Sequence, residues 1–486
     1  MDRKNSGMGA RPIALAVLII GMAVSGAPVA DEGPPSLAFK QDGFTITGHF
    51  QAGANAVSER NLFWNLSETF APQAGFDPDA DWLELYVKPG VSFTFDADEG
   101  VTLYGKASAV ASYTWGTDPF DARNTGRATW EEGYLGLRTD LGEGLRLDIS
   151  AGPRELRLGT GMLISNGGSS GFERGALKFG PRKAWEFAAI ARLTAGSVQA
   201  TGFYIQPNEQ RSNDSGNALL GGDIRYDPKG GGFLGVTYLN VVTSNAPYPQ
   251  AAFGGVGPPT VTPGDREGLN AVSLYAASPP FGGVLSDLFL TADVAFEWNP
   301  RIDMRAYGGR AQIGHRFPDL PWSPVLTYSY QTFSGDDPNT TRQERFDPLY
   351  YDGGLTAWAT GTKAAMLFIN SNVNAHSLAL RLSPSPKDTV TLRYARVRAN
   401  ELQSPVQFGQ ATRLSFVGGN LGTVVSGVTD AHLSDDLMIE YSRILNSYTF
   451  LTAGFSVTFP GQGIRAVAPG DTPAWTGGFV NLVVNF

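Results

Sequence analysis

The amino-acid sequence ends in a nine-residue stretch, 478–486, that reads GFVNLVVNF. Its apolar side chains occupy every second position, at Val480, Leu482, Val484 and Phe486, and two asparagines face the other way. Because successive side chains of a strand point to opposite faces, this period of two predicts a strand with one apolar and one polar face. Such a strand fits the wall of a barrel with lipid outside and water inside, and the alternative is the last strand of an ordinary sandwich.

Several other stretches share this period of two. The clearest lie at 44–50, 145–150, 378–382 and 390–394, and looser examples lie at 437–442 and 450–459. Gly, Pro and Asp cluster between these runs, as turns require. Some connections are short and others, such as 243–268 and 335–363, are long, which is typical of a membrane barrel. Roughly 16 to 20 candidate strands with no composition shift between them predict a single domain.

The composition narrows the class of protein. Only 17% of the 486 residues are charged, compared with about a quarter in a typical soluble domain, and the 60 glycines suit a sheet-rich chain. The absence of cysteine excludes a disulfide scaffold, a thiolate metal site, a Cys nucleophile and a lipid-anchored Cys. The four histidines lack the short spacing of metal ligands, so we expect no metal or cofactor.

The N-terminal segment has the pattern of a secretory signal peptide. Arg3, Lys4 and Arg11 precede an apolar run at 13–24, and small residues follow it. The alternative, a membrane anchor, needs about 20 apolar residues. We expect residues 1–30 to be removed, with cleavage after Gly26 or Ala30; losing one acid and three bases changes the net charge from -9 to -11. Residues 31–486 then form the mature, acidic, exported protein.

No later stretch is long and apolar enough for a membrane helix, because Asp, Arg, Gly or Ser interrupts every run. Barrel strands need only about 9 to 11 residues, with every second one apolar. Lipid offers no partner for an open sheet edge, so the last strand must bond to the first. We therefore predict an all-β protein, a single closed antiparallel transmembrane β-barrel in the outer membrane of a Gram-negative bacterium, in contact with outer-membrane lipid. A soluble sandwich or propeller would carry more charge on its exposed face.

The terminal strand also resembles the closing strand by which outer-membrane barrels are recognised for insertion. We accordingly expect Val480, Leu482, Val484 and Phe486 to form a signal that the barrel-assembly machinery reads. Eight tryptophans are candidates for the aromatic girdles at the two membrane boundaries: Trp82, Trp115, Trp130, Trp185, Trp298, Trp322, Trp358 and Trp475.

Two stretches carry a family resemblance. Residues 150–165 read SAGPRELRLGTGMLIS and are followed by GFERGA at 171–176; residues 329–339 read SYQTFSGDDPN and are followed by RFDPLY at 345–350. In this order they resemble the alginate-export family of outer-membrane β-barrels. The resemblance implies a barrel of about eighteen strands that passes anionic polysaccharide or small anionic solutes. The chain has Pro153 and Met162 where the family has arginines, and Arg154 where it has glutamine.

Six arginines are candidates for the solute pathway in the lumen, because a guanidinium stays charged and can pair with a carboxylate in two places: Arg146, Arg154, Arg157, Arg174, Arg381 and Arg393. The alternative is a lattice of ion pairs that only solvates the lumen. Three acidic residues of the long loop, Asp336, Asp337 and Asp347, could offer oxygen ligands to Ca²⁺, but their spacing favours an acidic loop with a turn at Asp337. We expect this loop to gate the lumen.

No enzyme is predicted. The one Gly-x-Ser-x-Gly match, at 167–171, lacks the strand-then-helix setting of a nucleophile elbow. No patch fits nucleic acid. The expected function is an outer-membrane channel for anionic solutes that works by diffusion through a charged lumen, and the alternative is a structural or adhesive surface barrel with a plugged lumen.

Overall fold

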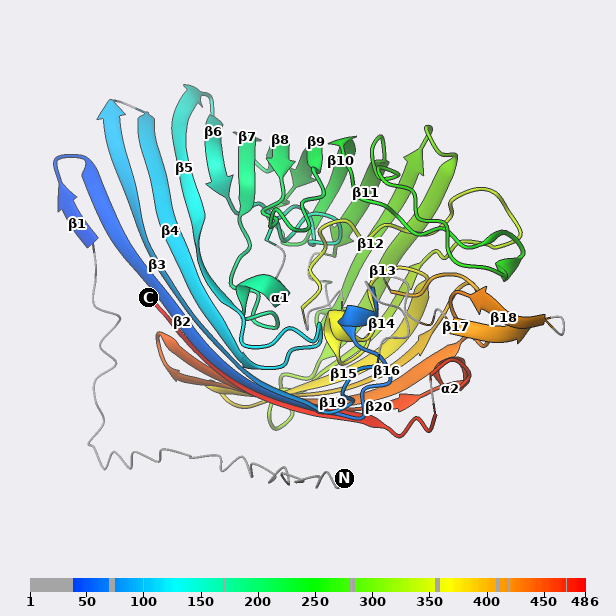
Figure 1. The fold of residues 1–486 in the computed structure, drawn as a ribbon. Helices are drawn as coiled ribbons and strands as arrows, with labels where there is room; N and C mark the ends of the chain where they lie inside the picture. Colours follow the sequence, from blue (N-terminus) through cyan, green and yellow to red (C-terminus); the bar gives the residue numbers. More distant parts are fainter. Residues whose placement is uncertain are drawn as a thin grey trace, which may run out of the picture.

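The computed structural model describes residues 38–486 except 70–74, 99, 169–170, 279–280, 282–284, 355–358, 408–410, 412, 418–419 and 469. The predicted signal peptide lies outside the described residues. Strands make up nearly all of the regular structure (Figure 1). They are β1 (Ala38–Gln41), β2 (Phe44–Arg60), β3 (Ala80–Asp98), β4 (Val101–Gly116), β5 (Gly126–Gly142), β6 (Leu145–Arg154), β7 (Trp185–Ala195), β8 (Val198–Gln206), β9 (Ala218–Tyr226), β10 (Phe233–Thr243), β11 (Asn270–Ala277), β12 (Leu288–Asn299), β13 (Met304–Arg316), β14 (Val325–Phe333), β15 (Val373–Ser385), β16 (Asp388–Arg398), β17 (Arg413–Val417), β18 (Asn420–Val425), β19 (His432–Asn446), β20 (Thr449–Pro460) and β21 (Trp475–Asn485).

The helical elements of the described chain are short. They are α1 (Gly171–Arg174), α2 (Gln462–Arg465) and the 3-10 turns η1 (Leu66–Thr69), η2 (Phe253–Gly255) and η4 (Ala364–Met366). None of the helices in this part of the chain has the length and apolarity to span a bilayer.

Antiparallel pairing joins neighbouring strands all the way around the barrel. Each strand from β2 to β16 pairs with the next, β16 pairs with β19, and β19, β20 and β21 follow in order. β21 pairs with β2 over ten residues, from Gln51 opposite Asn485 to Arg60 opposite Thr476. Eighteen strands therefore form a closed ring, which confirms the predicted barrel and its closure by the last strand. β1 pairs with the start of β2 beyond the end of β21, and β17 and β18 form a separate hairpin.

The two rims of the barrel differ. Tight turns connect β3 to β4, β5 to β6, β7 to β8, β15 to β16 and β19 to β20 at the rim where β2 begins and β21 ends. The opposite rim carries the long connections 154–185, 243–270, 333–373 and 398–432. Outer-membrane barrels place short turns in the periplasm and long loops outside the cell. We call these the turn rim and the loop rim.

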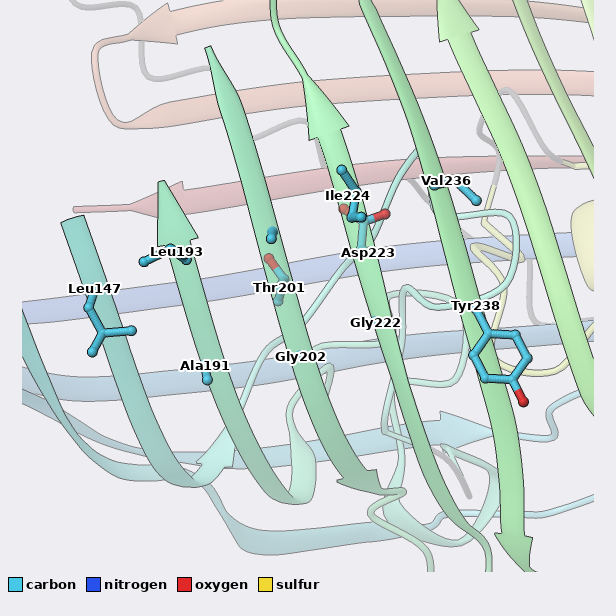
Figure 2. Close-up of a pocket in the computed structure, with 11 residues that line it drawn as sticks. Leu147, Ala191, Leu193, Thr201, Gly202, Gly222, Asp223, Ile224, Val236 and Tyr238 are labelled. Atoms are coloured by element: carbon cyan, nitrogen blue, oxygen red, sulfur yellow. The ribbon is translucent and has the colours of Figure 1, made fainter. Parts of the chain in front are cut away.

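The outer face is apolar, as the period of two predicts. Leu378 and Leu392 are exposed on the outer face, and the alternating Ala379 and Arg393 point inward. Val480 and Leu482 are exposed on the outside of β21, with Asn481 between them. Small side chains also leave a shallow apolar hollow of about 460 Å³ on the outside of β6 to β10, lined in part by Leu147, Ala191, Leu193, Gly222 and Tyr238 (Figure 2).

The tryptophans divide between the two faces. Trp115, Trp130, Trp298 and Trp322 are exposed, in accord with a girdle. Trp82, Trp185 and Trp475 are buried on the inside, so the girdle prediction is wrong for them. Their indole N–H groups explain the difference, because each donates to an acceptor within the barrel: Glu84, the Leu156 carbonyl and Glu59 respectively. Trp358 lies outside the described residues.

On β2 and β16 the inner face is buried only toward the loop rim. In β2 every residue from Phe44 to Ala54 is half-exposed, whereas Asn55, Val57 and Glu59 are buried. β16 shows the same change, with its inward residues buried only from Ala395 onward. The barrel is therefore filled toward the loop rim and open toward the turn rim. We call the open part the vestibule.

Candidate functional site

The segment from 155 to 184 leaves the barrel wall after β6 and folds into the interior, where Figure 1 shows α1 inside the curve of the sheet. Apolar side chains drive this inward path. Leu156, Leu158, Met162, Leu163 and Ile164 are all buried in one cluster with inward residues of β7 to β14. A loop with this apolar content would expose a large apolar area if it extended into water, so it packs against the wall instead.

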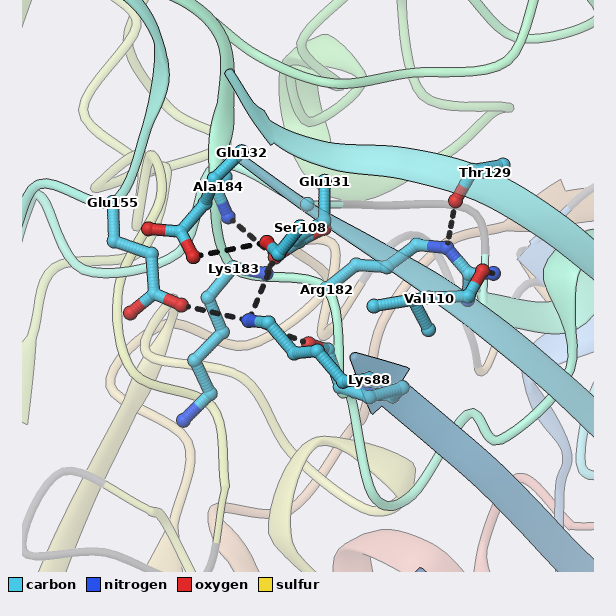
Figure 3. A network of polar contacts seen from close by, with 12 residues as sticks. Lys88, Ser108, Val110, Thr129, Glu131, Glu132, Glu155, Arg182, Lys183 and Ala184 are labelled. Atoms are coloured by element: carbon cyan, nitrogen blue, oxygen red, sulfur yellow. Dashed lines mark hydrogen bonds and ion pairs between the residues drawn. The ribbon is translucent and has the colours of Figure 1, made fainter. Parts of the chain in front are cut away.

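Buried carboxylates on the wall hold the segment in place. Glu84 of β3 is fully buried and accepts the backbone N–H groups of Lys178 and Phe179 at 2.8 and 2.9 Å. Glu131 of β5 accepts those of Lys183 and Ala184 at 2.8 and 3.1 Å (Figure 3). These acceptors satisfy backbone groups that would otherwise be buried without a hydrogen bond.

A β-bulge explains why Glu131 points inward. Ser108 of β4 pairs with Glu132, and the next residue, Ala109, pairs with Trp130, so Glu131 is the extra residue. The bulge lets two consecutive carboxylates face the interior. Glu132 forms an ion pair with Lys106 at 2.6 Å. The Glu131-Glu132 pair breaks the period of two, and this is the signal from which sequence reasoning could have found the site.

Cations complete the network shown in Figure 3. The Lys88 ammonium of β3 lies 3.3 Å from Glu131 and 3.0 Å from Glu155. Arg182 is buried and donates to the Thr129 and Ser112 hydroxyls and to the Arg127 carbonyl. Burial, together with the positive charge of Arg174, lowers the pKa of Arg182 to about 10, so the side chain still carries its charge at neutral pH. The segment is anchored to β3, β4 and β5.

The tip of the segment reaches the opposite wall. The Thr160 hydroxyl donates to Asp293, near the middle of β12, and the Ser273 hydroxyl of β11 donates to the same carboxylate at 2.6 Å. Gly159 packs against Tyr275, where an added Cβ would lie 2.9 Å from the ring. The segment 155–184 therefore joins β3 and β5, whose buried carboxylates hold it, to β12 on the far side of the lumen.

The second long segment, 334–372, also turns inward. Asp347 is fully buried, and Arg266 donates to both of its oxygens, at 2.6 and 3.0 Å. The Asp347 N–H donates to Glu297 of β12 at 2.8 Å. Farther along, the Lys363 ammonium lies 3.0 Å from Glu59 of β2. The expected gating loop is thus anchored at both ends.

The three acidic residues of this segment have separate roles. Asp336 is buried and accepts the N–H groups of Ala251 and Glu344, both at 2.7 Å. Burial raises the pKa of Asp336 to about 6. Asp337 accepts the Asn339 N–H at 2.9 Å and closes an exposed turn, and Asp347 forms the Arg266 ion pair. Among the described residues no group of three acids or histidines is placed to hold a metal ion.

The two segments meet inside the barrel. Tyr350 donates its N–H to the Leu163 carbonyl at 3.0 Å, and its own carbonyl accepts the Ser165 N–H at 2.9 Å. Arg157 forms an ion pair with Asp352 at 3.0 Å. Together the described residues of the two segments form a layer across the lumen, which we call the partition and define as residues 155–168, 171–184, 334–354 and 359–372.

On the turn side of the partition, charged residues line the vestibule. The Arg154 guanidinium lies 4.5 Å from the Tyr134 ring centre and donates to the Tyr104 hydroxyl at 3.1 Å. Arg138 pairs with Asp148 at 3.2 Å, and the Tyr104 hydroxyl also donates to Asp148.

A second group of arginines lies on the inner face of β13 to β16. Arg316 is opposite Val325, which is opposite Arg381 on the next strand, so these arginines belong to one cross-strand row. Arg393 lies one strand farther and two residues closer to the loop rim. No carboxylate of the described residues lies within 4.0 Å of the charged nitrogens of Arg316, Arg381 or Arg393.

The structure thus separates the six arginines that were predicted to line the pathway. Arg381, Arg393 and Arg154 face the vestibule. Arg146 pairs with Asp140 at the turn rim, and Arg157 belongs to the partition. Arg174 is buried, and its guanidinium donates to the backbone carbonyl and the side chain of Asn208.

Comparisons with known proteins agree with the fold. The sequence model of the alginate export family matches residues 291–473, which include the second of the two resembling stretches, and this confirms the resemblance. One similar structure is OccK2 (OpdF) of Pseudomonas aeruginosa in complex with glucuronate, at 10% sequence identity and a TM-score of 0.51; the match covers 91% of this chain and 98% of that chain. A BenF-like porin from Pseudomonas fluorescens Pf-5 is similar at 9% identity and a TM-score of 0.51, over 91% of this chain and 98% of that chain. The outer membrane protein opdK from Pseudomonas aeruginosa is similar at 8% identity and a TM-score of 0.51, over 90% of this chain and 98% of that chain. No curated protein sequence matches the chain. The chain is an outer-membrane β-barrel with the porin fold.

Proposed function

We propose that this barrel is a passive channel for anionic solutes. The observation that carries the proposal is the group of three arginines, Arg316, Arg381 and Arg393, that face the vestibule without a carboxylate partner within 4.0 Å among the described residues. Glu440 of β19 is the acid whose charge acts on Arg393, and it lies beyond ion-pair distance. Among the described residues, none of the three arginines is therefore held in a direct ion pair. Selectivity depends on the charge beside the pathway, so the negative net charge of the whole chain does not oppose it.

The resemblance supports the same solute class. The alginate export family match points to export of an anionic polymer, and the structurally similar OccK2 binds glucuronate, a small anionic sugar acid. Both carry carboxylates, which an arginine recognises by two parallel hydrogen bonds.

One observation favours a second candidate function, a surface barrel with a plugged lumen. The partition contacts β2 to β5 on one side and β11 and β12 on the other, and it is held by buried carboxylates. A channel requires a path past these segments, whereas a structural barrel requires none.

Single-channel recording in planar bilayers separates the two candidates. We expect open steps with a reversal potential that shows anion selectivity, and a shift toward cations in the variants Arg381→Glu and Arg393→Glu. Arg211→Glu, an exposed residue of the 206–218 connection, serves as the control and should leave the reversal potential nearly unchanged. A protein that inserts stably and stays silent would support the plugged barrel, and unchanged potentials in both vestibule variants would contradict the role assigned to these arginines.

A further inference from the structure

Arg154 occupies an unusual place in the vestibule. It is the last residue of β6 and its side chain turns back toward the turn rim, where its guanidinium lies 4.5 Å from the Tyr134 ring centre and 5.7 Å from that of Tyr104. Gly136 makes room for this arrangement, because an added Cβ would lie 2.2 Å from the Tyr104 ring. The tyrosine therefore lies against the wall, and the arginine packs over it.

The surrounding hydrogen bonds fix the orientation of the guanidinium. One terminal nitrogen, Nη1, donates to the Tyr104 hydroxyl at 3.1 Å and to the Ser150 hydroxyl. The Tyr104 hydroxyl donates in turn to Asp148, which also accepts from Arg138. Asp148 thus forms an ion pair with Arg138 and fixes the orientation of the Tyr104 hydroxyl. That hydroxyl in turn accepts the hydrogen bond from Arg154.

The opposite edge of the guanidinium has a different environment. Nε and Nη2 of Arg154 make no hydrogen bond to any described residue, and Arg154 is only half-buried. Its neighbour Glu155 is 3.0 Å from Lys88, and the nearby Glu132 is 2.6 Å from Lys106, so both acids already have cationic partners. An arginine uses its Nε and Nη2 edge to bind a carboxylate by two parallel hydrogen bonds.

We infer that Arg154, held by Tyr104 and Tyr134, forms a binding subsite for the carboxylate of a small sugar acid on the turn side of the partition. The inference rests on the proposed function and adds a specific residue and ligand class to it. A phosphate ester fits the same two-donor edge of the arginine. We assign the carboxylate because the structurally similar OccK2 binds glucuronate, and the test compares the two anions directly.

The test uses block of chloride current by added glucuronate in the full barrel. We expect glucuronate to block the wild-type channel and Arg154→Gln to raise the half-blocking concentration at least about tenfold, as for the loss of one charge-assisted contact. Arg154→Lys keeps the charge but loses the two-donor edge, so we expect a several-fold rise. Arg146→Gln, whose arginine pairs with Asp140, is the control, and glucose and glucose 6-phosphate are the neutral and phosphate comparisons.

Calorimetric titration of the detergent-solubilised protein with glucuronate separates this inference from the proposed function. Binding that Arg154→Gln weakens, in a barrel that passes no current, would support the subsite and overturn the channel. Chloride conductance with glucuronate block that is equal in the wild type and both Arg154 variants would overturn the subsite and leave the channel standing. Tighter block by glucose 6-phosphate than by glucuronate would overturn the carboxylate assignment.

Discussion

Replacing Glu131 by alanine should release one anchor of the partition without opening the barrel wall. The carboxylate is fully buried, accepts the Lys183 and Ala184 N–H groups and lies 3.3 Å from the Lys88 ammonium. The strand pairing of β5 with β4 and β6 uses backbone groups and does not involve this side chain. The damage should therefore stay local to the segment 155–184.

The magnitude follows from these contacts. A hydrogen bond to a charged acceptor contributes about 1.5–3 kcal/mol, and removing one member of a buried ion pair costs about 3–5 kcal/mol. The two contributions overlap, because they involve the same carboxylate, so we take about 3–5 kcal/mol as the loss for the anchored segment. Since 1.4 kcal/mol corresponds to a factor of ten, local opening should become about 10² to 4 × 10³ times more frequent.

Amide hydrogen exchange of the detergent-solubilised barrel measures this opening. We expect the amides of Lys183 and Ala184 to exchange at least about a hundredfold faster in Glu131→Ala, while those of β12 to β14 stay as slow as in the wild type. Glu186→Ala removes an exposed glutamate two residues farther along and should change neither set. Equal exchange of Lys183 and Ala184 in Glu131→Ala and the wild type would refute the view that this carboxylate anchors the partition.

Three further predictions follow from single contacts. Burial raises the pKa of Asp336 to about 6 from an ordinary value of 3.8, so the folded loop binds the proton more tightly than the unfolded chain. The stability of the loop should rise by about 3 kcal/mol as pH falls from about 7 to about 3. Asp336→Asn should remove this dependence, which hydrogen exchange of the loop amides measures. Gly477→Ala would place a Cβ 1.7 Å from the Glu59 carboxylate, where β2 pairs with β21, and should destabilise the barrel. The temperature at which the folded barrel unfolds in a heat-modifiable gel shift should therefore fall. An unchanged temperature would contradict this packing. Phe486→Ala removes a ring whose centre lies 5.3 Å from that of Phe50, and with it the last side chain of the proposed insertion signal. We expect less folded barrel in outer membranes but a similar thermal stability of the barrel once it has folded. Normal assembly of the variant would argue against the signal.

The barrel itself could be predicted from the sequence because it follows from a local pattern. A period of two is set by the pleat of each strand, so it identifies the outer face at Leu378 and Leu392 without knowledge of any neighbour. The same local pattern placed Arg381 and Arg393 opposite the apolar face. Closure followed from the absence of hydrogen-bond partners in lipid, and the pairing of β21 with β2 agrees.

The partition could not be predicted in this way, because its contacts join residues that are far apart in the chain. Thr160 reaches Asp293, and Lys363 reaches Glu59 across about three hundred positions. The same distance effect turned Trp185 inward, where the Leu156 carbonyl accepts its indole N–H, and buried Arg174 against Asn208. Sequence alternation decides which face of a strand meets lipid, whereas only the tertiary structure decides which segments fill the lumen, because that depends on packing between elements the sequence does not bring together.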